Sequence, residues 1–75
     1  MEELYKIVAE VFEIDIHEVS DELGPDGVEK WDSMGQLALI GAIEARFRIT
    51  FEIEEIFEIF RIGDIKKILM KKGVK

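Results

Sequence analysis

Cysteine is absent from the 75 residues, and proline and histidine each occur once. The lack of cysteine excludes a disulfide framework and any zinc site built on Cys ligands. Basic side chains are also scarce in residues 1–60, which hold sixteen acidic and four basic ones, a net charge of −12; residues 61–75 hold one acidic and six basic. A nucleic-acid-binding protein needs a basic surface, so this balance argues against that class and favours a basic protein partner for residues 1–60.

Long apolar runs are missing as well. The longest, Leu37–Ile43, is far shorter than the roughly 20 residues of a membrane span. The sequence begins with Met1, Glu2 and Glu3, which are unlike the basic start of a signal peptide. A chain of this length buries only ~60% of the surface of its unfolded form, which favours one small domain over residues 1–75 without a deep active site. We expect a cytoplasmic monomer.

Apolar residues with helical spacing predict three longer helices. The first covers residues 2–13, because apolar side chains recur at i, i+3, i+4, i+7 and i+8 from Leu4. The second runs from Ser33 to about Arg48, and the third from Ile62 to Lys72 with Gly73 as its stop. The second helix is expected to have a broad apolar face of Met34, Leu37, Ile40, Gly41 and Phe47, with Leu39 and Ile43 beside it. Glycine in mid-helix costs roughly 0.5–1 kcal/mol relative to alanine, so Gly41 is predicted to permit close packing.

The connections between these helices predict one short helix and one long loop. Residues 14–31 form the loop, with a single helical turn over 15–20. Its apolar residues are expected to face the core (Ile14, Ile16, Val19, Val28 and Trp31) and its polar ones to face water (Asp15, His17, Glu18 and Asp21). Residues 49–53 are expected to form an extended connector. The helical spacing of Ile53, Ile56, Phe57 and Phe60 suggests a short helix after it, over about 54–59. The predicted fold class is therefore all-α: a small four-helix bundle with a short third helix and a long first loop.

The segment Lys30-Trp31-Asp32-Ser33-Met34-Gly35 is the strongest candidate site. It lacks the Gly-x-Ser-x-Gly pattern of a hydrolase nucleophile, and His17, the single histidine, has the character of an exposed loop residue. The loop also fails the register of an EF-hand counted from Asp21, and no glycine-rich phosphate loop is present. We therefore predict no catalytic residue and no metal site. Ser33 at a helix start is either an attachment point for an anionic group or, with Asp32, simply a helix cap.

Asp32-Ser33-Met34, opening an apolar helix, resembles the Asp-Ser-Leu signature of acyl carrier proteins and related thiolation domains. Chain length, acidity, serine position and helix spacing all fit this resemblance. It implies that a phosphopantetheinyl transferase attaches a 4′-phosphopantetheine arm from coenzyme A to Ser33. The arm would carry an acyl or aminoacyl group as a thioester to loading and transferring enzymes of fatty-acid, lipid or secondary-metabolite biosynthesis. The protein itself would be a carrier and not an enzyme.

The resemblance also implies a partner surface and a shelter for the cargo. Partner recognition is assigned to residues of the second helix and its start: Asp32, Met34, Ala38 and Glu44. An acyl pocket between the second and third helices would be lined by five residues: Leu37, Ile40, Ile43, Ile56 and Ile59. Gly35, Ala38 and Ala45 stand where carriers of fatty-acid synthesis commonly have acids, which favours a specialised free-standing carrier. The alternative is an unmodified helical module that binds a partner through the Met34–Ile43 face.

Overall fold

The computed structural model describes residues 1–74 as four α-helices and two short 3-10 helices, with no strand in that range. The elements follow in the order α1 (Glu2–Phe12), η1 (Ile16–Glu18), η2 (Pro25–Gly27), α2 (Ser33–Phe47), α3 (Ile53–Phe57) and α4 (Ile62–Lys71). The long loop predicted between the first two helices contains both 3-10 helices. The predicted all-α fold with a short third helix is confirmed.

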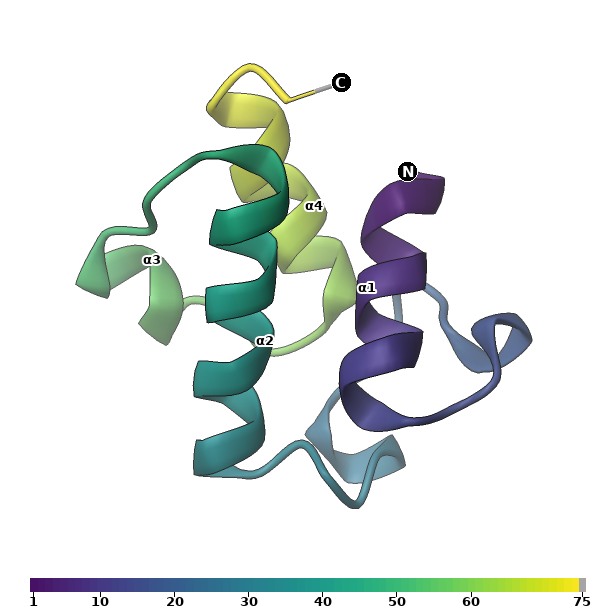
Figure 1. Ribbon diagram of the computed structural model, residues 1–75. Helices are drawn as coiled ribbons and strands as arrows, with labels where there is room; N and C mark the ends of the chain where they lie inside the picture. The colour runs from purple at the N-terminus through teal and green to yellow at the C-terminus, as the bar shows by residue number, and fades with distance from the viewer. Residues whose placement is uncertain (75) are drawn as a thin grey trace.

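α2 stands between α1 and α3, and α4 lies behind it and closes the bundle (Figure 1). The core lies where α1, α2 and α4 meet and consists of aliphatic and aromatic side chains only. Its fully enclosed members, at less than 2% exposure, come from all three of these helices: Leu4, Val8, Phe12, Leu39, Ile43, Ile62, Ile65 and Leu69. None of the helices among residues 1–74 combines the length and apolar character that a membrane crossing requires.

The helix ends differ by one or a few residues from those predicted. α1 and α2 each stop one residue early, because Glu13 and Arg48 adopt the left-handed conformation with φ of 56° and 57°. α3 begins at Ile53 because Glu52 and Glu55 form a capping box, and it ends at Phe57, two residues before the predicted end. α4 ends at Lys71, and Gly73 follows with φ of 88°, as expected for a glycine stop.

The predicted inner face of α2 is partly wrong. Leu39, Ile40 and Ile43 are buried, whereas Met34 is 78% and Leu37 is 65% exposed. At 100° per residue, the two exposed side chains lie outside the arc that Leu39, Ile40 and Ile43 turn toward the core. α2 is therefore apolar on its solvent side as well as on its core side.

The prediction of close packing at Gly41 is also wrong, since a Cβ atom there would meet nothing within 4 Å. The tight contact is at Gly35 instead, where a Cβ would come within 2.0 Å of the carbonyl oxygen of Lys30. Packing therefore requires glycine at position 35, and the absence of an acid there gives no information about partners.

The long loop is attached to the bundle at its middle and at its C-terminal end. Val19, Val28 and Trp31 are buried as predicted, but Asp21 does not simply face water. Its carboxylate accepts a hydrogen bond from the Tyr5 hydroxyl and lies 3.3 Å from Lys66 Nζ, and its carbonyl oxygen accepts from Gly63 N at 2.8 Å. The hydrogen bond from Tyr5, with Lys66 as a further cause, lowers the pKa of Asp21, and the same contacts raise the pKa values of Tyr5 and Lys66.

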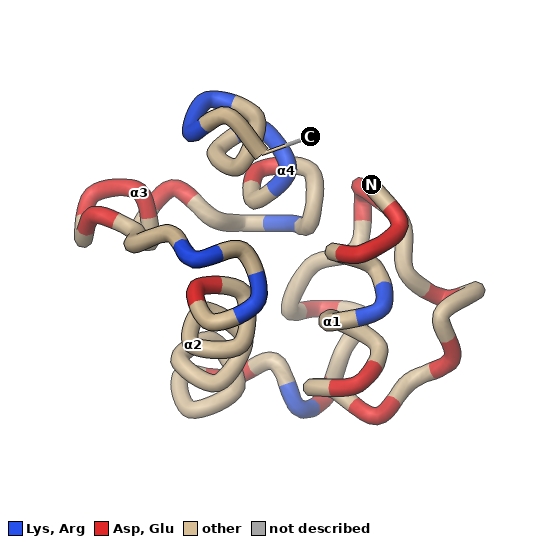
Figure 2. Tube along the Cα trace, turned by 45° about the horizontal axis from the view of Figure 1, so that its top comes forward, with Lys and Arg blue, Asp and Glu red and all other residues tan. Residues whose placement is uncertain are grey.

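The basic end of the chain is partly neutralised inside the molecule. Figure 2 shows acidic residues along α3 and basic ones along α4. Lys66 pairs with Asp21 of the loop, and Lys72 pairs with Glu55 of α3 at 2.9 Å, with both partners of this second pair about four-fifths covered. Two of the basic residues after position 60 thus hold the loop and α3 against α4.

Candidate functional site

Ser33 is the first residue of α2, and its side chain is exposed. The residue before it, Asp32, is the helix cap: its Oδ1 accepts a hydrogen bond from Gly35 N at 2.8 Å, and its carbonyl oxygen accepts from Gln36 N at 2.8 Å. The helix start therefore does not need the Ser33 hydroxyl. The sequence left two roles open for Ser33, attachment of an anionic group and helix capping. Asp32 performs the capping.

The segment before Ser33 is held firmly against α1. Trp31 is 5% exposed, its ring stacks on Phe12 with 5.2 Å between ring centroids, and its Nε1 donates to Gln36 Oε1 at 2.6 Å. The Lys30 ammonium pairs with the Glu13 carboxylate, and this contact lowers the pKa of Glu13. Because Lys30 also touches Gly35 through its backbone, the chain enters α2 in one fixed path. Ser33 is therefore an exposed hydroxyl on a rigid support.

The start of α2 suits an attached anion better than it suits catalysis. The backbone N–H groups of the first helical turn and the helix dipole favour negative charge there. The only histidine, His17, lies in η1 on the other side of α1 from α2, and its side chain is 91% exposed beside Asp15 (Figure 1). Nothing therefore supplies an imidazole base to Ser33. Within residues 1–74, no three or more His, Cys, Asp or Glu side chains are placed to hold a metal ion.

The four residues assigned to partner recognition do not form one uniform surface. Met34 and Ala38 are exposed on the solvent side of α2, and Asp32 is exposed at its start although its carboxylate serves as the cap. Glu44 is half-buried, and its Oε2 accepts a hydrogen bond from Phe51 N at 2.8 Å. Glu44 thus anchors the connector that leads to α3.

The five acyl-pocket candidates divide in a similar way. Ile40, Ile43 and Ile59 are buried in the core, Ile56 is half-buried against it, and Leu37 lies on the surface. Three pockets among residues 1–74 are lined by other side chains and by none of these five. The four interior side chains of this set belong to the hydrophobic core or pack against it. Leu37 is wrong as an interior residue because its position on α2 turns it toward solvent.

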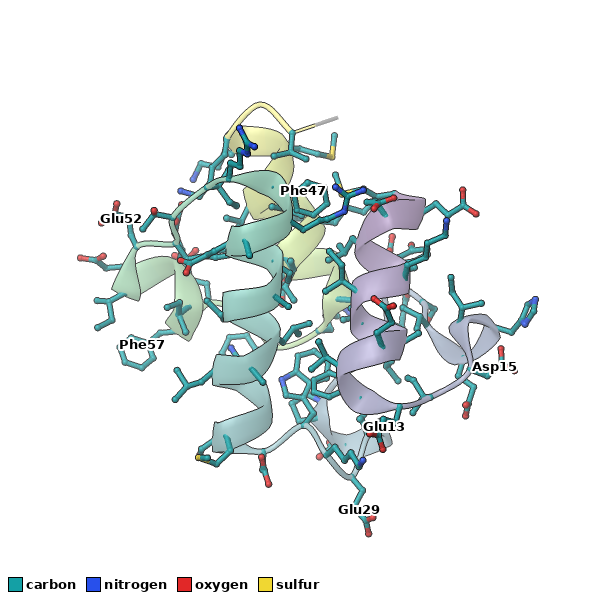
Figure 3. All side chains as sticks on the ribbon, viewed as in Figure 1. Glu13, Asp15, Glu29, Phe47, Glu52 and Phe57 are labelled. Carbon is teal, nitrogen blue, oxygen red and sulfur yellow. The ribbon has the colours of Figure 1, made fainter. Side chains whose placement is uncertain are left out.

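The exposure of large apolar side chains in and after α3 was not predicted from the sequence. Phe57 and Phe60 are each 73% exposed and Ile53 is 65% exposed, whereas the sequence indicated only that these residues and Ile56 have helical spacing. Figure 3 shows the Phe57 ring projecting away from the bundle. Helical spacing could have identified Phe57, which follows Ile56 directly and is therefore turned by about 100° from it. It could not have identified Phe60, which is four residues from Ile56 and lies beyond the end of α3. The α2–α3 apolar surface is hereafter the set Met34, Leu37, Ile53, Phe57 and Phe60.

Comparison with solved structures finds a close match in fold. The solution structure of a holo acyl carrier protein from Geobacter metallireducens superposes with a TM-score of 0.87 and 26% sequence identity, over 96% of this chain and 83% of that one. No protein-family model and no curated protein sequence matches this chain. The resemblance to the acyl carrier protein family that Asp32-Ser33-Met34 suggests is confirmed by the structural match.

Proposed function

We propose that this chain acts as an acyl carrier protein, with one carrier domain over residues 1–75 that works in the cytoplasm as a monomer and performs no bond-making step itself. Ser33 is its attachment site for 4′-phosphopantetheine. The observation that carries the proposal is the placement of Ser33: an exposed hydroxyl at the first position of α2, with the cap supplied by Asp32. The match of the whole fold to a holo acyl carrier protein supports it.

The residues at the start of α2 fit the phosphodiester of the arm. A phosphodiester on Ser33 keeps one negative charge, which the helix start stabilises by ~0.3–1 kcal/mol at an exposed site. Asp32 contributes a second negative charge, but its Oδ1 is engaged by Gly35 N. When bound, the arm supplies a terminal thiol that holds the cargo as a thioester. The chain supplies the rigid, exposed hydroxyl and the surface that partner enzymes bind.

Attachment requires an external enzyme because Ser33 has no base of its own. Ser33 Oγ forms a bond to the phosphorus that bears the pantetheine part of coenzyme A. The bond from this phosphorus to the bridging oxygen of the pyrophosphate breaks, the adenosine bisphosphate leaves with that oxygen, and the serine proton passes to a base of the phosphopantetheinyl transferase. Mg²⁺ held by that enzyme offsets the charge of the phosphates.

The cargo and the partner enzymes are proposed to be specialised. α2 is uncharged on its solvent side from Met34 to Gly41, so an enzyme that recognises several acids along this helix would find none there. Met34 and Ala38 offer apolar contact instead, as at the centre of many interfaces. This surface favours a partner enzyme of lipid or secondary metabolism that binds through shape and apolar contact more than through charge.

The direct test is the mass of the intact protein after incubation with coenzyme A, Mg²⁺ and a phosphopantetheinyl transferase. The natural chain is expected to gain one arm, and Ser33→Ala is expected to gain none while keeping the same helical circular-dichroism spectrum. A chain that accepts no arm under conditions in which another carrier is modified contradicts the proposal. It would leave the alternative, an unmodified module that binds through the Met34–Ile43 face.

A further inference from the structure

Gln36 is the only carboxamide side chain in this sequence, which contains no asparagine. It ends the first turn of α2, three residues after Ser33. Residues three or four apart on a helix are neighbours, with about 5–6 Å between their Cβ atoms. The neighbour four residues after Ser33 is Leu37, which belongs to the α2–α3 apolar surface and has no polar side-chain atom. Gln36 therefore supplies the polar side chain next to Ser33 along α2.

The amide of Gln36 is held at the start of α2 by Trp31. Trp31 Nε1 donates to Gln36 Oε1 at 2.6 Å, and the Trp31 ring is buried against Phe12. An indole N–H can only donate, so the oxygen of the amide has to face it. Because Trp31 precedes the helix, this contact shows that the Gln36 side chain reaches back over the turn that begins at Ser33.

The nitrogen of this amide has its donors available. Gln36 Nε2 forms no hydrogen bond within residues 1–74. Gln36 is half-buried, and no buried side-chain N or O atom in this range lacks a partner, so Nε2 is in contact with solvent. Nε2 is bonded to the same carbon as Oε1, which Trp31 fixes, so its two N–H groups lie near the start of α2 and point away from the indole.

Few groups at the start of α2 can balance a negative charge on Ser33. The basic residue nearest to it in the sequence is Lys30, and the Lys30 ammonium is paired with Glu13. α2 contains no lysine or arginine in its first three turns. Asp32 adds a negative charge and can only accept hydrogen bonds. A phosphodiester on Ser33 therefore depends on uncharged N–H donors of this chain.

Two backbone N–H groups of the first turn are available as well. Asp32 occupies two others, because its Oδ1 accepts from Gly35 N and its carbonyl oxygen accepts from Gln36 N. The N–H groups of Ser33 and Met34 form no hydrogen bond in the part of the chain that the structure describes. They point along the helix axis. A donor on one side of the helix is needed to fix the orientation of an anion that these two groups bind.

We propose that Gln36 binds the phosphodiester of the arm: Nε2 donates to one of its non-bridging oxygens, beside the backbone N–H groups of Ser33 and Met34. Gln36 is thereby a positioning residue, held by Trp31, that restricts the directions in which the arm leaves Ser33. Hydrogen bonds to an ionised oxygen are roughly twice as strong as those between neutral groups, which favours this contact. The inference rests on the proposed function, because it takes Ser33 as the attachment point.

The contact can be observed directly, because the single glutamine and the single tryptophan each give a distinct side-chain signal in a ¹⁵N–¹H correlation spectrum. The chain is measured before and after reaction with coenzyme A, Mg²⁺ and a phosphopantetheinyl transferase, and complete attachment is verified by mass. The amide signals of Gln36 are expected to move downfield, because its N–H groups gain a charged acceptor. The indole signal of Trp31 is expected to move much less, because its acceptor, Gln36 Oε1, is the same in both states.

Two variants separate binding of the phosphodiester from support of Trp31. Gln36→Glu keeps an oxygen that accepts from the Trp31 indole but has no N–H donor, whereas Gln36→Met has neither. In the modified proteins, the ³¹P signal of the phosphodiester is expected to shift in both variants. The Trp31 indole signal is expected to move upfield, as for a lost hydrogen bond, only in Gln36→Met. Leu37→Met, at the other neighbour of Ser33, is the matched control and should leave both signals in place.

Four results would overturn the inference. Gln36 amide signals that stay in place although the mass shows complete modification would leave Gln36 as a support of Trp31 only, with Ser33 still the attachment site. The same ³¹P signal in the natural chain and in both variants would show that Gln36 does not bind the phosphodiester. A ³¹P shift in Gln36→Glu alone would come from the added charge and not from the lost donor. Absence of the arm from the natural chain would contradict this contact and the proposed function together.

Discussion

The two sides of α2 are built differently. Toward α1, Trp31 stacks on Phe12, the backbone of Lys30 touches Gly35, and Arg46 Nε donates to Glu3 at 2.6 Å. Toward α3, the polar contacts of α2 are sparser: the connector donates a hydrogen bond to Glu44, and α3 itself is joined to α4 by the ion pair of Glu55 with Lys72. The aromatic ring on the α3 side, Phe57, is exposed, whereas the ring on the α1 side, Trp31, is buried.

From this difference we infer that the α1 side supports Ser33 and that the α3 side is where partners bind. The α1 side fixes the path of the chain into Ser33, so substitutions there are expected to change stability. The α3 side displays apolar and acidic groups that the fold does not need for packing, so substitutions there are expected to change binding. Because Ser33 lies where the two sides meet at the start of α2, each side can be tested separately.

The largest expected difference in stability is between removing a buried aromatic ring on the α1 side and removing an exposed one on the α3 side. Trp31→Ala should lower the free energy of unfolding by ~3–5 kcal/mol, because it leaves a cavity against Phe12 in the core. Phe57→Ala should change it by less than ~0.5 kcal/mol, because the ring is exposed. Urea denaturation followed by circular dichroism measures both. Similar losses for the two variants would remove the distinction between the two sides.

A smaller effect, with opposite signs, is expected at the two glycines of α2. Gly35→Ala should destabilise the fold by ~1–3 kcal/mol or more, because its Cβ would overlap the Lys30 carbonyl oxygen. Gly41→Ala should stabilise it by roughly 0.5–1 kcal/mol, since the site is open and alanine favours the helix. Melting curves of both variants against the natural chain decide this. A stable Gly35→Ala protein would show that the loop before Ser33 yields easily.

The next effect concerns two neighbouring residues at the start of α2. Asp32→Ala should cost ~0.5–2 kcal/mol because it removes the cap on Gly35 N. Ser33→Ala should cost less than ~0.5 kcal/mol because its hydroxyl does not cap the helix. Both values come from denaturant titrations at pH 7. If Ser33→Ala proves the more costly of the two, the capping roles are reversed.

The smallest effects concern the ion pairs Asp21–Lys66 and Glu55–Lys72, which join the loop and α3 to α4. The pKa of Asp21 is lowered chiefly by the Tyr5 hydroxyl, and that of Glu55 chiefly by the backbone N–H of Glu52, with the lysines contributing to both. A lowered carboxyl pKa stabilises the fold above its unfolded value of about 4, and this stability is lost as pH falls through the folded pKa.

Melting temperature is therefore expected to hold or rise between pH 7 and pH 5, as the self-repulsion of the acidic residues 1–60 weakens, and to fall below about pH 4. Moderate salt at pH 7 should also raise it. Asp21→Asn and Glu55→Gln should melt lower at pH 7 and lose less on acidification than the natural chain. A steady fall from pH 7 to pH 5 would contradict the repulsion argument.

Helical periodicity and turn residues were enough to predict the four helices, a helical turn within 15–20, where η1 lies, and the burial of Trp31. Which side of α2 faces the core was harder, because this helix is apolar almost all round and Leu37 fits either side. The role of Asp21 depends on contacts with Tyr5 and Lys66, which are far from it in sequence, and the role of Gly35 depends on the path of the loop that precedes α2. Helical spacing reveals neither. The tight contact was therefore assigned to the wrong glycine.

The central claim is that Ser33 alone carries the arm, and mapping the modified position tests it most directly. Trypsin cuts after Lys30 and Arg46, which releases a peptide of residues 31–46 whose only hydroxyl side chain is Ser33. Tandem mass spectrometry of the chain treated with coenzyme A, Mg²⁺ and a phosphopantetheinyl transferase should place the arm on this peptide. An arm on the preceding peptide, which contains Ser20, or no arm on any peptide, would contradict the claim.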